Sequence, residues 1–341
     1  MSDDLSNSQR RATGTTMRAA VCVRAGGPEV LEIQERPVPA VREGWSLVQV
    51  KGAGLNRSEL RTRQGHSPSV TFPRVLGIEC VGVVAASTDP GLPDGTTVAA
   101  VMGEMGRAFD GGYAEWALLP NSLLMPVTTA LPWDVLAALP ETYLTAQGSL
   151  DALGIAAGGP GRLLIRGGTS SVGMAAASIA SGYGLETAAT TRSPGKAGAL
   201  SAAGADHVLV DDGRSLAASV RAVWPHGPDY VLDLVGASTA VDSLHLVRRG
   251  GTVCMTGTLS GWVIPDLEPV AMIPSGTRLT AFHSRHVQGS AGTAVLQRIV
   301  AEVEAGLYRP NVDRVFGLRD IAAAHRYMES NQAAGKLVLV P

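Results

Sequence analysis

The chain has 341 residues, of which 45% are hydrophobic and 17% charged. An apolar fraction this high excludes a natively disordered chain, and the length suits about two average domains. The net charge of −2 gives none of the basic excess expected of a protein that binds nucleic acid or an anionic membrane surface.

Cysteine usage and the N-terminal segment restrict the class further. Cys22, Cys80 and Cys254 lie far apart and no C-x-x-C pair is present, so neither a disulfide framework nor a structural zinc lobe is expected. No apolar run approaches the roughly 18 residues of a membrane span, and residues 1–16 lack the apolar core of a signal peptide. We therefore predict a disordered tail over residues 1–16 and a reduced, cytoplasmic protein.

The first part of the folded chain, from residue 17 to about 119, has short apolar segments separated by Gly, Pro and Asp residues. The predicted strands span residues 17–23, 30–35, 45–51, 75–85 and 97–102. Strands this short and closely spaced indicate a compact, mostly β unit. After Pro132, the Leu- and Ala-rich segment 133–154 predicts helices.

Regular alternation of strands and helices begins at residue 162. Predicted strands at 162–166, 185–191, 207–210, 230–235, 252–255 and 278–282 alternate with predicted helices at 172–181, 196–203, 215–223 and 238–247. Such alternation predicts right-handed crossovers and a doubly wound parallel sheet, so the fold class is α/β. Two further helices, at 294–305 and 320–329, and a strand at 336–340 complete the chain.

A glycine-rich turn follows the first strand of this sheet. The segment LLIRGGTSSVGMAAASIA (163–180) matches G-x-G-x-x-G as Gly168-x-Ser170-x-x-Gly173, with serine in place of the middle glycine. Small residues let backbone N–H groups approach a pyrophosphate, and the following helix N-terminus adds a partial positive charge. A degenerate match alone is weak, but its place between a strand and a helix of the alternating region predicts a dinucleotide site.

The end of the second strand indicates which dinucleotide binds. An NAD site places Asp or Glu about 20 residues after the glycine turn, where the carboxylate accepts hydrogen bonds from the ribose hydroxyls. Here the strand ends in Thr190-Thr191-Arg192-Ser193, followed by Lys196, with no carboxylate. Two cations and several hydroxyls suit a 2′-phosphate, so we predict NADP(H). The alternative is a solvated loop that carries surface Arg and Lys.

Eight motifs in order along the chain carry a family resemblance. They are GLNRSEL (54–60), GIECVGVV (77–84), FDGGYAEWALLP (109–120), LPETYLTAQGSL (139–150), IRGGTSSVG (165–173), GADHVL (204–209), VLDLVG (231–236) and AAGKLVLV (333–340). Together they resemble the medium-chain dehydrogenase/reductase superfamily, in its zinc-free quinone oxidoreductase branch, over residues 17–341. The resemblance implies a GroES-like β-rich catalytic domain at 17–140, completed by 285–341, and a Rossmann NADP(H)-binding domain at 141–284. It also implies an active site in the cleft between the two domains.

The motifs depart from the zinc-dependent members of this superfamily at two ligand positions. Those members carry a cysteine in the loop equivalent to 54–60 and a histidine between the residues equivalent to Gly77 and Glu79. In this chain Asn56 and the two residues after it occupy the first place, and Ile78, which cannot ligate a metal, occupies the second. We therefore predict no catalytic metal.

Without a Lewis acid, the resemblance implies hydride delivery from NADPH to a quinone or an α,β-unsaturated carbonyl. It implies that Asn56 and Thr145 line the nicotinamide end, where the Asn56 amide can bond the carboxamide or the substrate carbonyl. The further candidate cofactor residues are Gly168, Ser170, Ser171, Val172, Thr191, Arg192, Lys196, Val235, Gly236, Thr256, Gly257, Thr258, Phe282 and Lys336. Tyr143 is a candidate catalytic residue, and His66 and Tyr113 are further candidate proton donors; reprotonation by solvent is the alternative.

Three functional interpretations stay open. The first is an NADPH-dependent quinone or enone reductase, and the second is an enoyl reductase acting on thioester or polyketide-type intermediates. The third is a catalytically silent NADPH-binding regulatory protein. In each case we expect a small-molecule ligand and no nucleic-acid or membrane partner. The resemblance also implies a homodimer joined through the Rossmann sheet, with the predicted strand 278–282 as the candidate edge.

Overall fold

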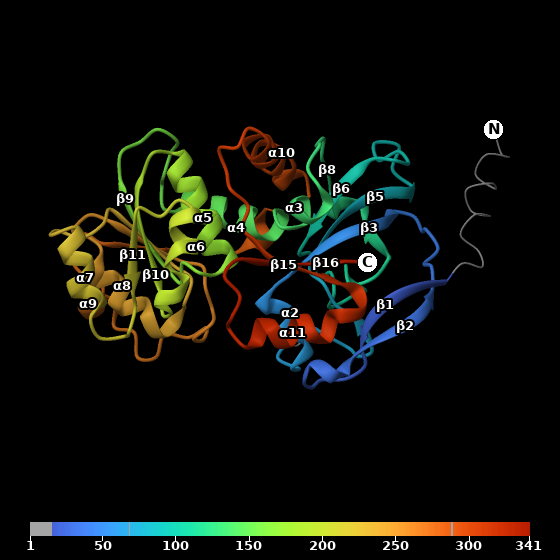
Figure 1. Cartoon of the computed structure of the whole chain (residues 1–341), viewed down its shortest axis with the longest axis horizontal. Coiled ribbons are helices and arrows are strands. Elements are labelled where there is room, and N and C mark those ends of the chain that lie inside the picture. The colour runs from blue at the N-terminus through green and yellow to red at the C-terminus, as the bar shows by residue number, and fades with distance from the viewer. Residues whose placement is uncertain (1–15, 68, 288) are drawn as a thin grey trace. The chain divides into compact units, whose positions relative to one another are not determined.

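The computed structural model describes residues 16–67, 69–287 and 289–341 and divides the chain into two compact units (Figure 1). Unit 1 consists of residues up to 141 together with 285–304 and 312–341, and unit 2 consists of 142–284 and 305–311. The tail predicted over 1–16 lies outside the described residues except for Thr16, which already pairs with Pro37 in the first strand. No helix in the described ranges is long and apolar enough to cross a bilayer.

Unit 1 is built on two β-sheets. The smaller sheet has the order β2-β1-β4, and the larger has the order β15-β16-β3-β5-β6-β8, with β7 also paired to β3. The strands are β1 (Thr16–Cys22), β2 (Leu31–Pro37), β3 (Trp45–Leu55), β4 (Arg74–Val75), β5 (Glu79–Ser87), β6 (Thr97–Val101), β7 (Trp116–Pro120), β8 (Leu124–Pro126), β15 (Val312–Gly317) and β16 (Lys336–Val340). The C-terminal strand β16 therefore lies between β15 and β3, inside a sheet formed mainly by the first part of the chain.

The helices of unit 1 cover its sheets. They are η1 (Pro28–Val30), α2 (Arg57–Arg63), η2 (Asn121–Leu123), α3 (Trp133–Ala137), α10 (Ser290–Glu304), η6 (Leu318–Asp320) and α11 (Ile321–Glu329). Helix α11 contributes Ile321, Ala324 and Met328 to the same apolar cluster as Ala20 and Val75. The C-terminal segment is thus part of the core of unit 1.

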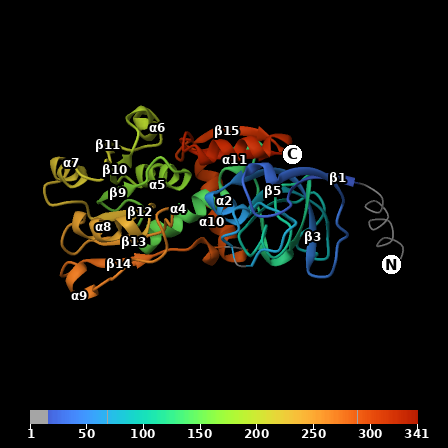
Figure 2. The same ribbon diagram turned by 90° about the horizontal axis from the view of Figure 1, so that it is seen from below.

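Unit 2 contains a six-stranded parallel sheet with the order β11-β10-β9-β12-β13-β14 (Figure 2). The strands are β9 (Arg162–Arg166), β10 (Glu186–Thr191), β11 (His207–Val210), β12 (Tyr230–Asp233), β13 (Thr252–Met255) and β14 (Arg278–Ala281). The chain moves outward from β9 in one direction and then from β12 in the other, which is the doubly wound Rossmann order. The predicted α/β fold class is confirmed, and β14 is the predicted sixth strand.

Helices connect the strands of unit 2, and helix α4 (Pro140–Ala152) leads into it from unit 1. The others are α5 (Ser171–Gly182), η3 (Pro194–Lys196), α6 (Ala197–Ala202), α7 (Leu216–Val223), η4 (Ala237–Thr239), α8 (Ala240–Leu246) and α9 (Pro269–Met272); η5 (Ser284–His286) leads back to unit 1. An apolar cluster including Leu164, Trp224, Val231 and Leu244 packs helices against strands. Because the strands are parallel, the carboxyl ends of β9, β10 and β12 lie at the same end of the sheet, which is where open α/β sheets bind ligands.

Candidate functional site

The glycine turn after β9 leaves no room for side chains. Gly167 has a positive φ of 76°, and its N–H donates to Thr190 Oγ1 at 3.1 Å. A Cβ added to Gly168 would lie 2.9 Å from the Ala189 Cβ, and one added to Gly173 would lie 2.6 Å from the Gly168 carbonyl oxygen. The tight turn and the close approach of α5 to β9 therefore require glycine at the predicted positions.

The N-terminus of α5 supplies the groups that a phosphate needs. Ser170 is the N-cap: its Oγ accepts from Gly173 N at 3.1 Å and donates to the Gly167 carbonyl at 2.8 Å. The N–H groups of Ser171 and Val172 begin the helix, before the i→i−4 ladder starts, and so remain directed outward at its positive end. This cradle fits a dinucleotide pyrophosphate, with the Ser170 hydroxyl serving the helix cap rather than a ligand.

The turn after β10 is the predicted adenosine end. Thr191 is buried, and its Oγ1 accepts from Ser193 N at 3.0 Å, which fixes the start of the turn. Arg192 is exposed, and Lys196, at the end of η3, is half-buried. The turn has cations and hydroxyls and no carboxylate of its own, the composition that suits a 2′-phosphate.

A buried carboxylate shapes the turn after β12. Both oxygens of Asp233, which is fully buried, are used. Oδ1 accepts from the N–H groups of Val235 (2.9 Å) and Gly236 (3.0 Å), and Oδ2 accepts from Thr239 Oγ1 (2.8 Å) and Ser243 Oγ (2.6 Å). The predicted cofactor residues Val235 and Gly236 are thus held in place by an aspartate to which the sequence analysis gave no role.

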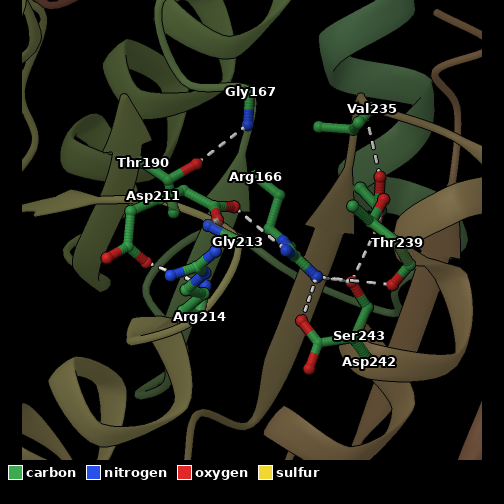
Figure 3. Close-up of polar contacts among 12 residues, drawn as sticks. Arg166, Gly167, Thr190, Asp211, Gly213, Arg214, Val235, Thr239, Asp242 and Ser243 are labelled. Atoms are coloured by element: carbon green, nitrogen blue, oxygen red, sulfur yellow. Dashed lines mark hydrogen bonds and ion pairs between the residues drawn. The ribbon is translucent and has the colours of Figure 1, made fainter. Parts of the chain in front are cut away.

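A second charged network lies beside it, around Arg166 (Figure 3). Arg166 ends β9, is only 3% exposed, and pairs with Asp211 at 3.0 Å and Asp242 at 2.6 Å. The signal in the sequence was an arginine directly after three apolar residues (163–165) of a parallel strand, because a cation buried at that place needs acidic or polar partners.

The predicted nicotinamide residues of unit 2 lie on α4 and in the loop that follows β13. Thr256 follows β13, and its Oγ1 is 2.9 Å from Ser149 Oγ, which also donates to the Thr145 carbonyl at 2.7 Å. Gly257 is required there, because an added Cβ would lie 1.9 Å from the Leu234 backbone. Ser149, which the sequence analysis did not name, therefore links the predicted residues Thr145 and Thr256, and Thr258 continues the loop after β13.

Two predicted aromatic residues have their ring contacts within unit 2. A Cβ added to Gly148 would come within 2.1 Å of the Phe282 ring, so this ring packs directly on α4. Tyr143 is 2% exposed and stacks on Tyr308 with ring centroids 6.2 Å apart. Burial raises the pKa of Tyr143 to about 12, and the nearby Ser178 hydroxyl partly opposes this rise. These surroundings are those of a packing residue, so we carry no proton-transfer role for Tyr143 into the function proposed below.

Unit 1 contributes a buried ion pair around Asn56. Lys336 Nζ donates to Glu79 Oε1 and to Asn56 Oδ1, each at 2.6 Å, and Asn56 Nδ2 donates to Glu79 Oε1 at 2.9 Å. Glu79 and Lys336 are 0% and 2% exposed. Gly54 makes room for the pair, because an added Cβ would lie 2.1 Å from Glu79 Oε1. Lys336 thus directs two of its three N–H donors into unit 1 rather than toward a ligand.

A second buried acid, Glu59, faces this pair. Its Oε1 accepts from Ile78 N at 3.1 Å and lies 3.4 Å from Asn56 Nδ2. Burial raises the pKa of Glu59 to about 7, against the lowering effects of the Ile78 N–H and the Lys336 ammonium. The Asn56-x-x-Glu59 spacing is that of a helix capping box, yet neither side chain caps α2: both are drawn into the buried pair instead.

The other candidate proton donors lie in different surroundings. His66 is exposed. Tyr113 is fully buried, its ring meets the His325 ring edge-on with centroids 5.9 Å apart, and burial together with the nearby Glu59 raises the pKa of its hydroxyl well above the usual value. Across the described ranges, no group of three His, Cys, Asp or Glu side chains could hold a metal ion.

Comparison with known proteins places this architecture in a family. An alcohol dehydrogenase GroES-like domain model matches residues 42–129, and a zinc-binding dehydrogenase model matches residues 203–339. The quinone oxidoreductase of Sus scrofa is 27% identical over 337 residues, which cover 96% of this chain and 99% of that protein. The chain belongs to the medium-chain dehydrogenase/reductase superfamily, in its quinone oxidoreductase-like branch. The GroES-like match lies within unit 1, whereas the dehydrogenase match covers the second part of unit 2 and the C-terminal segments of unit 1.

Two further relatives bear on ligand chemistry. A mycobacterial protein whose structure was solved in complex with NADPH is 28% identical, with a TM-score of 0.84, 95% of this chain covered and 100% of that one. The spectinabilin polyketide synthase system protein NorB of Streptomyces orinoci is 31% identical over 322 residues, which are 92% of this chain but only 14% of that protein.

Proposed function

We propose that this medium-chain dehydrogenase/reductase is a zinc-independent, NADPH-dependent reductase of quinones or α,β-unsaturated carbonyls. The proposal rests on the two positions at which zinc-dependent members of the superfamily carry zinc ligands. In this chain Ile78 is apolar, and Asn56 is hydrogen-bonded into the buried Glu79–Lys336 pair. An amide and an alkyl chain offer no zinc site, so an alcohol would not be activated as an alkoxide. An acceptor that is already electrophilic needs no such activation.

Cofactor binding is assigned to unit 2. The glycine turn, the N–H groups of Ser171 and Val172, and the Thr256 hydroxyl would hold the pyrophosphate and the ribose–nicotinamide end. Arg192 and Lys196 would hold a 2′-phosphate, which favours NADPH over NADH. When bound, the reduced nicotinamide supplies the hydride.

In unit 1 the proposed role belongs to Asn56, whose amide has a fixed orientation. Its Oδ1 faces the Lys336 ammonium, and one Nδ2 hydrogen is committed to Glu79 at 2.9 Å. The other Nδ2 hydrogen has only the longer 3.4 Å contact with Glu59 and is the one to be given to a carbonyl oxygen. Asn56 would then orient the acceptor and stabilise negative charge on its oxygen, and solvent would supply the proton.

A second candidate is an enoyl reductase acting on thioester intermediates, favoured by the similarity to a polyketide synthase system protein. The third, a silent NADPH-binding regulatory protein, shares every cofactor residue. One assay separates them: NADPH oxidation followed in parallel with 9,10-phenanthrenequinone, a simple enone and an enoyl thioester. We expect turnover with the quinone or the enone. Turnover confined to the thioester would support the second candidate, and NADPH binding without turnover on any acceptor would support the third.

A further inference from the structure

The turn after β10 lacks a carboxylate, yet the fold brings one to the next strand end. Asp211 directly follows β11, whose last residue, Val210, lies opposite Thr191 in the parallel register. The Asp211 N–H donates to the Thr191 carbonyl at 2.9 Å, so Asp211 lies at the same sheet edge as Arg192. An acid at this edge is the group that an NAD site uses to accept ribose hydroxyls and that a 2′-phosphate must avoid.

Both oxygens of the Asp211 carboxylate have partners: Oδ1 accepts from Gly213 N at 3.1 Å, and Oδ2 binds Arg166. Asp211 Oδ2 lies 3.0 Å from Arg166 Nη2, and the Asp211 side chain is only 13% exposed. The other side of the guanidinium is fixed by Asp242 (2.6 Å), Ser243 Oγ (3.1 Å) and the Thr239 carbonyl (3.3 Å). Figure 3 shows the Arg166 side chain between Asp211 and these groups at η4 and α8. The cation therefore has a fixed position from which it binds Asp211.

We propose that Arg166 is a positioning residue that sets cofactor specificity by withholding the Asp211 carboxylate from the adenosine-ribose subsite. The inference rests on the proposed NADPH site. Without Arg166, the Asp211 carboxylate would be able to accept hydrogen bonds from the ribose hydroxyls of NADH, to pair with Arg192, or to repel a 2′-phosphate. Each of these effects lowers the preference for NADPH over NADH. The neighbouring Asp212 is exposed, and its Oδ1 accepts from Arg214 N (2.8 Å) and Ser215 N (2.7 Å) within its own loop.

Binding of adenosine fragments tests the proposal without turnover. Calorimetry would compare 2′,5′-ADP with 5′-AMP for the wild type, Arg166→Met, Asp211→Asn and the double variant. We expect Arg166→Met to reduce the preference for 2′,5′-ADP by roughly tenfold or more, since a unit charge is uncovered beside the subsite. Asp211→Asn alone should change the preference less than about twofold. The double variant should return it to within about threefold of the wild type, because the Asp211 carboxylate beside the subsite is gone.

A matched control is Asp242→Asn, which removes the other carboxylate partner of Arg166 and leaves the Arg166–Asp211 pair in place. We expect it to leave the fragment preference unchanged.

Three results would overturn the proposal. The first is a folded Arg166→Met protein that keeps the wild-type preference for 2′,5′-ADP, and the second is a double variant that does not regain this preference. The third is an Asp211→Asn protein whose affinity for 2′,5′-ADP is several-fold higher than that of the wild type. If Arg166→Met does not fold, the double variant decides, since it must still prefer 2′,5′-ADP. A wild type that binds both fragments equally would instead refute the NADPH assignment itself.

Discussion

The buried side chains of Asn56, Glu79 and Lys336 hydrogen-bond one another, so each of the two charged groups depends on the other for compensation of its charge. Lys336 and Glu79 are almost fully enclosed, and removing one member of such a pair leaves an uncompensated charge that costs about 3–5 kcal/mol. Glu59 adds a second acid to a site that holds one ammonium, so the cluster is neutral when Glu59 carries a proton. Burial is the main cause of the raised pKa of Glu59, and the neighbouring Glu79 carboxylate adds to it.

The first prediction concerns the pH dependence that Glu59 contributes to stability. Its pKa rises from 4.5 to about 7 on folding, so this contribution is fully present below about pH 4.5 and is lost as pH rises through about 7. Glu59→Gln removes it. The free energy of unfolding of Glu59→Gln minus that of the wild type should therefore increase by up to about 3 kcal/mol between pH 5 and pH 8.

Urea unfolding at several pH values measures this difference. Burial and Arg63 lower the pKa of His325 to about 3, and this opposite effect is present in both proteins and cancels. Glu35→Gln, which alters an exposed carboxylate on β2, is the control and should show a flat difference. A flat difference for Glu59→Gln as well would mean that Glu59 is ionised in the folded protein.

The second prediction concerns the 2′-phosphate. If Arg192 holds it, Arg192→Ala removes a charge-assisted contact worth roughly 1.5–3 kcal/mol and weakens NADPH binding about ten- to a hundredfold, with NADH nearly unchanged. Lys196→Ala should act in the same direction but less, because an ammonium lacks the fork geometry of a guanidinium. Fluorescence titration with both cofactors measures the two effects. Equal losses for NADPH and NADH would contradict the assignment of this turn.

At the scale of elements, helix α5 depends on a single cap. Ser170→Ala removes the hydroxyl that accepts from Gly173 N and should lower the free energy of unfolding by about 0.5–2 kcal/mol. Ser171→Ala, one position further on and outside the cap, is the matched control and should change it by less than about 0.5 kcal/mol. Denaturant unfolding of the two variants compares them directly, and equal losses would show that the cap contributes nothing specific.

Elements with a strong local pattern were predictable from the sequence. The alternation after residue 162 predicted all six parallel strands, because short segments rich in apolar and β-branched residues recur there between turn residues and helical segments. Strand β15 was not predicted, since it is half-exposed along its length and its residues show no clean alternation. Helix α2 was also missed, because its seven residues are mostly charged or polar and are too few for a periodic pattern to appear.

The site was predictable only where backbone geometry dictates residue type. Gly168 and Gly173 could be identified from the sequence because only glycine fits at these two positions of the turn. The partners of Arg166 and Lys336 come from strands and helices far apart in sequence, and single-sequence patterns carry no information about such pairing. Lys336 was expected at the cofactor, whereas its ammonium lies in a buried pair within unit 1.

At the scale of the whole molecule, β14 is one of the two edge strands of the unit 2 sheet, and β11 is the other. Its Arg278 and Phe282 N–H groups bond to Gly251 and Met255, so the alternating N–H groups of Leu279 and Ala281 point away from the sheet. An exposed edge of this kind invites pairing with a second copy, and two-fold assemblies are the commonest oligomers.

We therefore predict a homodimer that pairs through β14. Ala281→Pro removes one of the outward N–H groups, so we expect it to shift the monomer–dimer equilibrium toward monomer without loss of NADPH binding. Light scattering at micromolar concentration measures both proteins. Ala281→Ser is the control that keeps the N–H and should stay dimeric. A monomeric wild type would contradict the prediction.

The central claim is a reductase that prefers NADPH and works without zinc. It is tested most directly by measuring kcat/KM for NADPH and NADH with 9,10-phenanthrenequinone, on protein treated with chelator and analysed for metal. We predict a preference for NADPH of at least about tenfold, unchanged by chelation, in protein with no stoichiometric zinc. A preference for NADH, or activity that is lost on chelation and restored by zinc, would contradict the account.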